Sequence, residues 1–369
     1  MESAVSRGAS SKRGVAHNGR VTATGEIDMF LKKVALTSGV AAAFMMASAT
    51  AATAFTACQV TDVGGIDDAG FNQTAWKGVQ DAMAEYGIDG RYLESQSETD
   101  YQPNLNSLIE SNCDVIVSVG FLMGDATATS AKANPDQKYS IVDFAYDPTI
   151  PNVIGQVYAT NEAGFLAGYL SAGMSKSGVV GTFGGINIPP VTAFMDGYYY
   201  GVAHYNSEKG TNVQVLGWNP MSKEGLFTGN FESLDDGRAF AQNLYDEGAD
   251  IVMPVAGPVG LGSAALADEL GTDSLMIVGV DADQTQTDPD RAHVYLTSVL
   301  KRMDSTVKQV IKTAMDGKFA GGLMVGTLAN GGVGLAPYHK LDDKVPAALK
   351  AEVEAVKAGL ISGKINAGG

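Results

Sequence analysis

A regular alternation of short apolar runs with amphipathic stretches, from Phe55 to about residue 315, constrains the fold of this chain more than any other feature. The runs have the length of buried strands, and the stretches between them repeat their apolar residues with a helical period. The strands are expected at 55–61, 114–119, 139–142, 153–157, 178–183, 213–216, 250–254, 275–280 and 293–298. The helices are expected from Asn72, as a cap, to Gly87, and at 102–111, 161–174, 191–205, 236–247, 259–270 and 303–315. Such alternation predicts an α/β fold, with parallel sheets covered by helices on both faces.

Two strand-to-helix turns begin alike and divide the chain into two parts. In residues 60–66 and again in residues 181–186, the end of a strand runs into a glycine pair, Gly64-Gly65 and Gly184-Gly185, before a helix. Glycines at such turns allow a tight bend and a close approach of another group. In parallel sheets, ligands bind beyond the carboxyl ends of the strands. The repeat therefore predicts two similar lobes whose turns face one cleft.

The first 54 residues have the features of a leader. Residues 1–28 show no apolar periodicity, and Met29 is an alternative start. Lys32 and Lys33 precede an apolar run at 34–46 and small residues at 47–54, which is the layout of a secretory signal. The apolar run is shorter than the roughly 20 residues that a membrane span requires. We therefore expect export to the periplasm or the cell surface.

The charge of the remaining chain excludes one class of partner. Residues 1–54 carry six basic and three acidic residues, so the rest has 19 basic and 38 acidic residues and a net charge of −19. Binding to nucleic acid depends on neutralising phosphates, and docking on anionic lipid also requires basic residues. Neither partner is expected.

The two cysteines allow three interpretations. Residues 55–58 resemble a lipobox, which would make Cys58 a lipidated N-terminus, although the first strand follows without a tether. An oxidising compartment would instead permit a disulfide between Cys58 and Cys113. The third alternative is two buried free thiols.

No motif of a known catalytic site occurs. The chain lacks a Gly-x-Ser-x-Gly elbow, a His-Glu-x-x-His site and a Walker-type loop. The pair Asp67-Asp68 has the chemistry to bind a metal or exchange protons, but such a pair more often caps a helix or orders a loop. We expect no enzymatic activity, no metal and no cofactor.

The predicted strand ends carry residues suited to a flat, polar ligand. Asp62, Asp143 and Asp281 lie at or just past three strand ends, and Phe71, Phe121 and Phe231 lie in loops near strand ends or glycines. Carboxylates accept hydrogen bonds from hydroxyls, and aromatic rings stack on flat groups. The combination predicts a site for a sugar or a nucleoside.

Several segments closely resemble the basic membrane protein family, which contains the purine nucleoside receptors of bacterial ABC importers. The resemblance covers nearly all of the chain after the leader, and it lies in residues 60–68, 70–73, 76, 113–116, 119–121, 162–168, 248–252, 256–260, 279–284 and 297–301. It implies a type I periplasmic binding protein: two Rossmann-like lobes joined by three crossovers around a cleft. The family is mostly known as lipoproteins with a spacer after the lipid-bearing cysteine, and this chain lacks the spacer.

The resemblance also implies a role for each of eight residues. On the base side, Phe71 and Phe231 would sandwich the base, while Asn72 and Asp143 would hydrogen-bond its edge, with Asp62 nearby.

On the sugar side, Asp281 would accept from the ribose hydroxyls, and Lys301 and the backbone of Gly257 would complete the pocket.

The expected lobes are 55–157 with a return at 298–325, and 158–297 with the tail 326–369. The expected function is that of an extracytoplasmic substrate-binding protein of an ABC importer, which passes a nucleoside with a purine base to a permease and an ATPase. The alternatives are a sensor that signals to a membrane protein, and a nucleoside hydrolase working through Asp62, Asp67 and Asp68.

Overall fold

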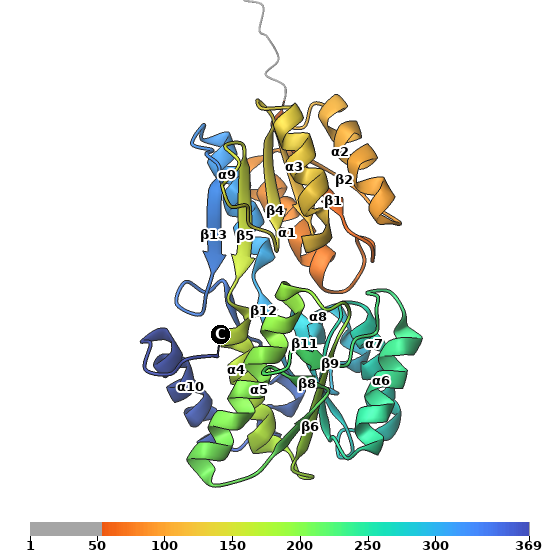
Figure 1. Ribbon diagram of the computed structural model, residues 1–369, viewed down its shortest axis with the longest axis vertical. Helices are drawn as coiled ribbons and strands as arrows, with labels where there is room; N and C mark the ends of the chain where they lie inside the picture. The colour runs from red at the N-terminus through yellow and green to blue at the C-terminus, as the bar shows by residue number, and fades with distance from the viewer. Residues whose placement is uncertain (1–53, 369) are drawn as a thin grey trace, which may run out of the picture. The chain divides into compact units, whose positions relative to one another are not determined.

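Two six-stranded sheets organise the chain in a computed structural model, which describes residues 54–368. The strand orders are β13-β5-β4-β3-β1-β2 and β14-β12-β11-β10-β6-β7. We call the first sheet with its helices the first lobe and the second sheet with its helices the second lobe; Figure 1 shows both. The predicted leader lies outside the described residues.

The first sheet is parallel throughout. Its strands are β1 (Thr56–Thr61), β2 (Asp89–Leu93), β3 (Val115–Val119), β4 (Lys138–Val142), β5 (Val153–Tyr158) and β13 (Gly322–Gly326). Its helices are α1 (Phe71–Tyr86), α2 (Tyr101–Glu110), α3 (Gly124–Ala133) and α9 (Met303–Met315), with short 3-10 turns at Glu98–Asp100 and Phe121–Met123. Figure 1 shows β13 beside β5, although some 160 residues separate them in the chain.

The second sheet is parallel except at one edge, where β14 runs antiparallel to β12. Its strands are β6 (Val179–Gly184), β7 (Gln214–Leu216), β10 (Ile251–Val255), β11 (Met276–Asp281), β12 (Tyr295–Lys301) and β14 (Val333–Leu335), and β8 (Trp218–Asn219) pairs with β9 (Glu224–Gly225) in a separate hairpin. Its helices are α4 (Thr160–Met174), α5 (Pro189–Lys209), α6 (Leu234–Asp246), α7 (Val259–Leu270), α8 (Gln284–Thr287) and α10 (Ala347–Ile361), with 3-10 turns at Pro289–Arg291 and His339–Lys344.

Each sheet has a hydrophobic core on both faces. In the first lobe, α1 and α9 cover one face and α2 and α3 the other. In the second lobe, α4, α5 and α10 cover one face and α6 and α7 the other. Two-sided cover is what parallel sheets require, because neither face can be left to water. The predicted α/β class is therefore confirmed.

The turns that look alike in the sequence also match in position. β1 and β6 hold the same place in their sheets, next to the edge strand: β1 lies between β3 and β2, and β6 lies between β10 and β7. β1 runs into the turn with Gly64 and Gly65, and β6 into the turn with Gly184 and Gly185. The prediction of two similar lobes agrees with this arrangement, and the type I periplasmic binding protein fold follows from it.

The chain passes between the two sheets three times, after Tyr158, after Lys301 and after Gly326. The crossovers bond to one another: Ala159 N–H donates to Gly326 O at 2.8 Å, and Arg302 N–H to Gly332 O at 2.9 Å. β12 belongs to the second sheet as far as Lys301. We therefore propose that the second crossover follows Lys301 rather than the residue 298 expected from the sequence.

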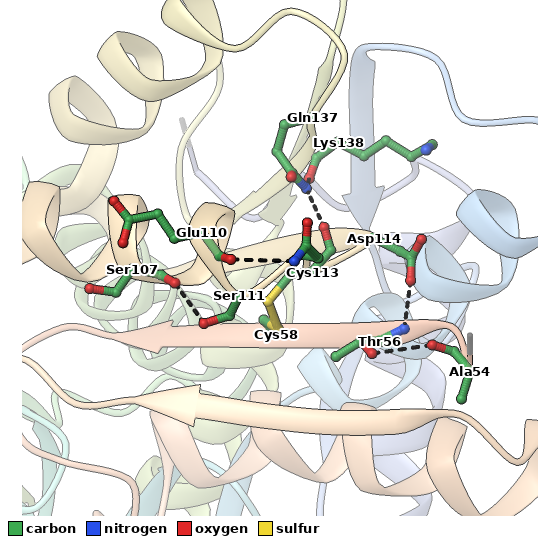
Figure 2. Close-up of a disulfide and its surroundings, with 11 residues drawn as sticks. Ala54, Thr56, Cys58, Ser107, Glu110, Ser111, Cys113, Asp114, Gln137 and Lys138 are labelled. Carbon is green, nitrogen blue, oxygen red and sulfur yellow. Dashed lines mark hydrogen bonds between the residues drawn. A yellow bond between two sulfur atoms is a disulfide. The ribbon is translucent and has the colours of Figure 1, made fainter.

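A disulfide joins Cys58, buried on β1, to Cys113 (Figure 2). Their Cα atoms are 6.0 Å apart. Cys113 precedes β3 rather than lying on it, while Cys58 has Ile116 as its partner across the ladder. Two further bonds order this end of the sheet: Thr56 N–H donates to Asp114 Oδ2 at 2.7 Å, and Gln137 Nε2 to Cys113 O at 2.9 Å. The Cys58 sulfur is thus engaged within the lobe and not available for a lipid in this structure.

The start of α1 differs from the prediction. The helix begins at Phe71 after Gly70, and Asn72 is not its cap. Asp68 takes that role, because its carboxylate accepts from the N–H groups of Gly70, Asn72 and Gln73. Within residues 54–368, no helix is long and apolar enough to cross a membrane.

Candidate functional site

A cleft of about 600 Å³, part of it open to solvent, lies where the carboxyl ends of the strands of both lobes meet. The structure brings all eight predicted ligand-binding residues to its walls: Asp62, Phe71, Asn72, Asp143, Phe231, Gly257, Asp281 and Lys301. The remaining lining residues are mostly apolar: Val63, Asp68, Phe121, Leu122, Ile188, Pro190, Val191, Phe194, Val255, Ala256 and Pro258. A mostly apolar cleft with a few polar groups is typical of small-molecule sites.

On the first lobe's side of the cleft, which we call the first wall, the loop after β1 is held in place by hydrogen bonds. Asp68 fixes this loop through the three N–H groups described above, at 2.7–3.1 Å. Asn72 Nδ2 donates to Asp62 Oδ1 at 2.9 Å, and Gln59 Nε2 donates to the Asn72 carbonyl at 3.1 Å. The backbone on either side of Phe71 is therefore fixed by hydrogen bonds, at Gly70 and at Asn72.

Asp143 and Asp281 hold equivalent positions in the two lobes. Asp143 follows β4, Asp281 ends β11, and these strands have the same place in their sheets. Both residues have a φ of 67°, which side-chain-bearing residues rarely adopt. Such strain persists where the surrounding structure enforces it, and it clusters at functional sites.

Lys301 brings these two carboxylates together. It ends β12 of the second sheet, and its Nζ lies 2.5 Å from Asp143 Oδ2 in the first lobe and 3.8 Å from Asp281 Oδ1 in its own. The ammonium also lies 4.7 Å from the centre of the Phe71 ring and 5.7 Å from that of Phe194. With 3% of its side chain exposed, Lys301 is a buried cation that bridges the lobes.

Burial makes the carboxyls of the cleft weaker acids than usual. Burial raises the pKa of Asp281 to about 6, and the nearby Lys301 opposes this effect while Asp143 adds to it. Burial likewise raises the pKa of Asp68 to about 6 against its backbone hydrogen bonds. The pKa of Asp62 is raised well above its ordinary value by burial, and that of Asp143 is raised by burial despite Lys301. Clefts with several perturbed carboxyls are candidates for function.

Two acceptor oxygens of the cleft residues are buried without a hydrogen-bond donor in the described part of the chain. They are Asn72 Oδ1 and Asp281 Oδ1. A buried acceptor without a partner is costly, so a ligand that donates to it gains more than it would in water. The site is thus suited to a ligand that donates hydrogen bonds.

On the second lobe's side of the cleft, which we call the second wall, two glycines shape the surface. A side chain at Gly185 would meet the Phe231 ring at 2.3 Å, so Gly185 leaves the space in which that ring packs. The loop of Phe231 is ordered by Asn230, whose Oδ1 accepts from Ser233 N–H at 2.8 Å and whose Nδ2 donates to Asp236 Oδ2 at 2.8 Å. Gly257 has a φ of 56° just before α7.

The two residues of the acidic pair Asp67-Asp68 have different surroundings. Asp68 is used by the start of α1, and Asp67 is exposed. Among residues 54–368 no group of three or more His, Cys, Asp or Glu side chains is arranged to hold a metal ion.

Sequence reasoning missed several residues of the cleft. Phe194 and Val191 lie on α5, where nothing in the helical period separates a cleft-facing residue from a core residue. Asp68 was expected in the cleft only for the alternative of a nucleoside hydrolase, and Phe121 was counted among the stacking rings but was not given a specific contact. At Gly120, just before Phe121, a side chain would meet Asp62 Oδ2 at 2.5 Å, so this glycine leaves space for that carboxylate.

Comparison with known proteins identifies the family. Residues 55–367 match the Bmp family, described as ABC transporter substrate-binding protein PnrA-like. The chain belongs to this family. The resemblance found in the sequence is thereby confirmed, and the family is one of substrate-binding proteins rather than enzymes.

Similar proteins occur in several bacteria. The "ABC transporter nucleoside-binding protein BmpA" of Lactococcus lactis subsp. cremoris is 32% identical over 83% of this chain and 87% of its own length. The "CD4+ T-cell-stimulating antigen" of Listeria monocytogenes is 32% identical over 84% of this chain and 87% of its own.

Among solved structures, an ABC transporter system solute-binding protein from Aeropyrum pernix K1 superposes with a TM-score of 0.76 at 28% identity, covering 85% of this chain and 92% of that one. This likeness supports the same two-lobed fold.

Proposed function

We propose that this protein binds a nucleoside with a purine base in the cleft between its lobes and delivers it to the permease and ATPase subunits of an ABC importer. One observation carries the proposal: an apolar, aromatic cleft also contains buried acceptor oxygens, on Asn72 and Asp281, that have no donor in residues 54–368. A nucleoside supplies both a flat ring to stack and hydroxyl and amine groups to donate.

The sugar end is assigned to the second lobe. Asp281 accepts from the ribose hydroxyls, and Lys301 and the backbone of Gly257 complete the pocket. Hydrogen bonds to a charged carboxylate contribute about 1.5–3 kcal/mol each. Asp281 Oδ1 is available as an acceptor for such a bond, because it accepts no hydrogen bond within residues 54–368.

The base is assigned to the aromatic residues. Phe71 and Phe231 stack on it from the two lobes, and Asn72 and Asp143 bond to its edge, with Asp62 holding Asn72. Stacking of a base on an aromatic ring contributes about 1–3 kcal/mol. Together with the sugar contacts, this accounts for a large share of the roughly 8 kcal/mol that a micromolar affinity represents.

The charges of the cleft favour a nucleoside over a nucleotide. Of the described residues that line the cleft, four are aspartates and one is a lysine. A phosphate would enter this acidic site with Lys301 as its main counter-charge, and Asp143 already engages Lys301 at 2.5 Å.

The proposed place of action is outside the cytoplasm. The signal-like stretch of the first 54 residues supports export, and so does the disulfide, which oxidising compartments permit. The name of the Lactococcus lactis relative, a nucleoside-binding protein, supports the ligand class.

Calorimetry with adenosine, guanosine, inosine, adenine, ribose and AMP tests the ligand class. We expect micromolar or tighter binding of at least one nucleoside, and weaker binding of the free base, the sugar and the nucleotide. Ligand released by denaturation and identified by mass spectrometry provides an independent check. Binding of AMP or ribose above every nucleoside would contradict the proposal, and recovery of free base after long incubation would indicate a hydrolase.

A further inference from the structure

The segment from Gly279 to Gln284 contributes one residue to the cleft, Asp281, while Gln284 lies outside the cleft walls. Gln284 is nevertheless buried, with 7% of its surface exposed. Its Nε2 donates to two backbone carbonyls at 3.2 Å each: Val280 in its own lobe and Ala69 in the first lobe. The side chain thus spans the two lobes beside the ligand site.

The second lobe holds Gln284 in a fixed orientation. Its N–H donates to Ser298 Oγ at 3.1 Å, and its Oε1 accepts from Thr287 at 3.3 Å. A side chain at Gly279 would meet Gln284 Cγ at 2.4 Å, so Gly279 provides the space in which Gln284 lies. Asp283 caps α8 through Thr285 N–H at 3.2 Å.

The first lobe presents its carbonyl from an equally ordered loop. Ala69 has a φ of 55°, and Asp68 on one side of it bonds to Gly70 N–H on the other at 3.0 Å. The same carboxylate holds Asn72 N–H at 2.7 Å. The carbonyl that Gln284 binds therefore belongs to the loop that presents Phe71 and Asn72 to the cleft.

We propose that Gln284 is a positioning residue: by binding the Ala69 carbonyl across the cleft, it holds the lobes closed and fixes the loop that contacts the ligand. This inference rests on the proposed binding of a nucleoside in the cleft, but Gln284 itself does not touch the ligand. The bond exists only while the lobes are together. Its loss should therefore increase the dissociation rate of the ligand more than it changes the association rate.

Gln284→Met tests the proposal, because it keeps the length of the side chain and removes both donor bonds. Dissociation of adenosine, followed by stopped-flow fluorescence, should accelerate by about 2- to 12-fold, the range expected for one neutral hydrogen bond, with little change in the association rate. Gln284→Glu should accelerate it further, because a carboxylate would face two carbonyl oxygens.

Gln286→Met is the matched control. Gln286 is exposed on the same short helix, and its Nε2 donates to Asp283 Oδ2 at 2.7 Å within one lobe. Its loss should leave the dissociation rate unchanged.

Small-angle scattering of the unliganded proteins separates this proposal from the ligand assignment. Gln284→Met should raise the radius of gyration relative to the parent and to Gln286→Met. If the parent does not bind adenosine but this increase is seen, the ligand is wrong and the role of Gln284 stands. The role would be overturned if both Gln284 variants kept the dissociation rate and the radius of gyration of the parent. A lower melting temperature as the only change would assign Gln284 to the stability of its own lobe.

Discussion

The two walls of the cleft use equivalent positions in different ways. In the first lobe, Asp62 accepts from Asn72, Asp68 accepts from three N–H groups, and Asp143 pairs with Lys301. In the second lobe, Asp281 has the same backbone conformation as Asp143, yet its Oδ1 has no hydrogen-bond donor in residues 54–368. Equal backbone geometry therefore does not imply equal function: Asp143 is engaged by Lys301 from the other lobe, while Asp281 keeps a carboxylate oxygen for a ligand.

Removing the cation between the walls should have the largest effect. Lys301→Met leaves Asp143 buried without its partner, and breaking a buried pair costs about 3–5 kcal/mol. We expect the free energy of unfolding, measured in urea, to fall by this amount and nucleoside binding to be lost.

The double variant Lys301→Met/Asp143→Leu is the control for the lost charge balance. It should recover much of the stability and none of the binding. A single variant as stable as the parent would show that the ion pair contributes nothing.

Asp281→Ala should weaken nucleoside binding by at least about tenfold, because it removes an acceptor worth about 1.5–3 kcal/mol per hydrogen bond. The protein should stay folded, since Oδ1 accepts no hydrogen bond within residues 54–368 and its ionic contact with Lys301 Nζ is long, at 3.8 Å. Calorimetry measures the change, and Asp67→Ala, at an exposed position outside the cleft walls, is the control. An affinity equal to that of the parent would show that Asp281 does not bind the sugar.

Lowering the pH should distinguish the functions of two carboxyls that have similar pKa values. Burial raises the pKa of both Asp281 and Asp68 to about 6. A carboxyl with a pKa above its unfolded value favours folding while protonated, so both contribute stability that declines as pH rises from about 4 to 6. Nucleoside affinity should change in the opposite direction and fall by up to about tenfold from pH 7 to pH 5, because Asp281 loses its charge.

Calorimetry across this range checks the difference. The loss of affinity should vanish in Asp281→Asn and persist in Asp68→Asn. The same pH dependence in all three proteins would assign it to another group.

The smallest effect is expected from Asp68→Asn. The amide replaces one of two carboxylate oxygens that hold the start of α1, so the free energy of unfolding should fall by about 1 kcal/mol. Affinity should change little, because Phe71 and Asn72 remain on the helix. A large loss of affinity with unchanged stability would show that Asp68 belongs to the binding surface.

Much of the fold could be predicted from the sequence, because local pattern dictates it. α7 and α9 have the predicted bounds; β3 and β4 differ from theirs by one residue at the start, and β6 and β10 by one residue at both ends. β13 was not predicted as a strand, since residues 322–326 have glycine at both ends and their position depends on pairing with β5, far away in the chain.

Part of the candidate site could also be predicted, because local pattern locates the ends of the strands. Asp143 and Asp281 were found because parallel strands end at a common edge. The role of Asp68 at α1 and of Gln284 between the lobes depends on contacts across space, which no local pattern records.

The three crossovers also impose an order on synthesis. α9 contributes Met303, Val307 and Val310 to the core on one face of the first sheet, and α10 contributes Leu349 and Val353 to a core of the second. A chain growing on the ribosome therefore has neither core complete until its last segments have been made. An export pathway that threads unfolded polypeptides would meet such a chain while it is still incompletely folded.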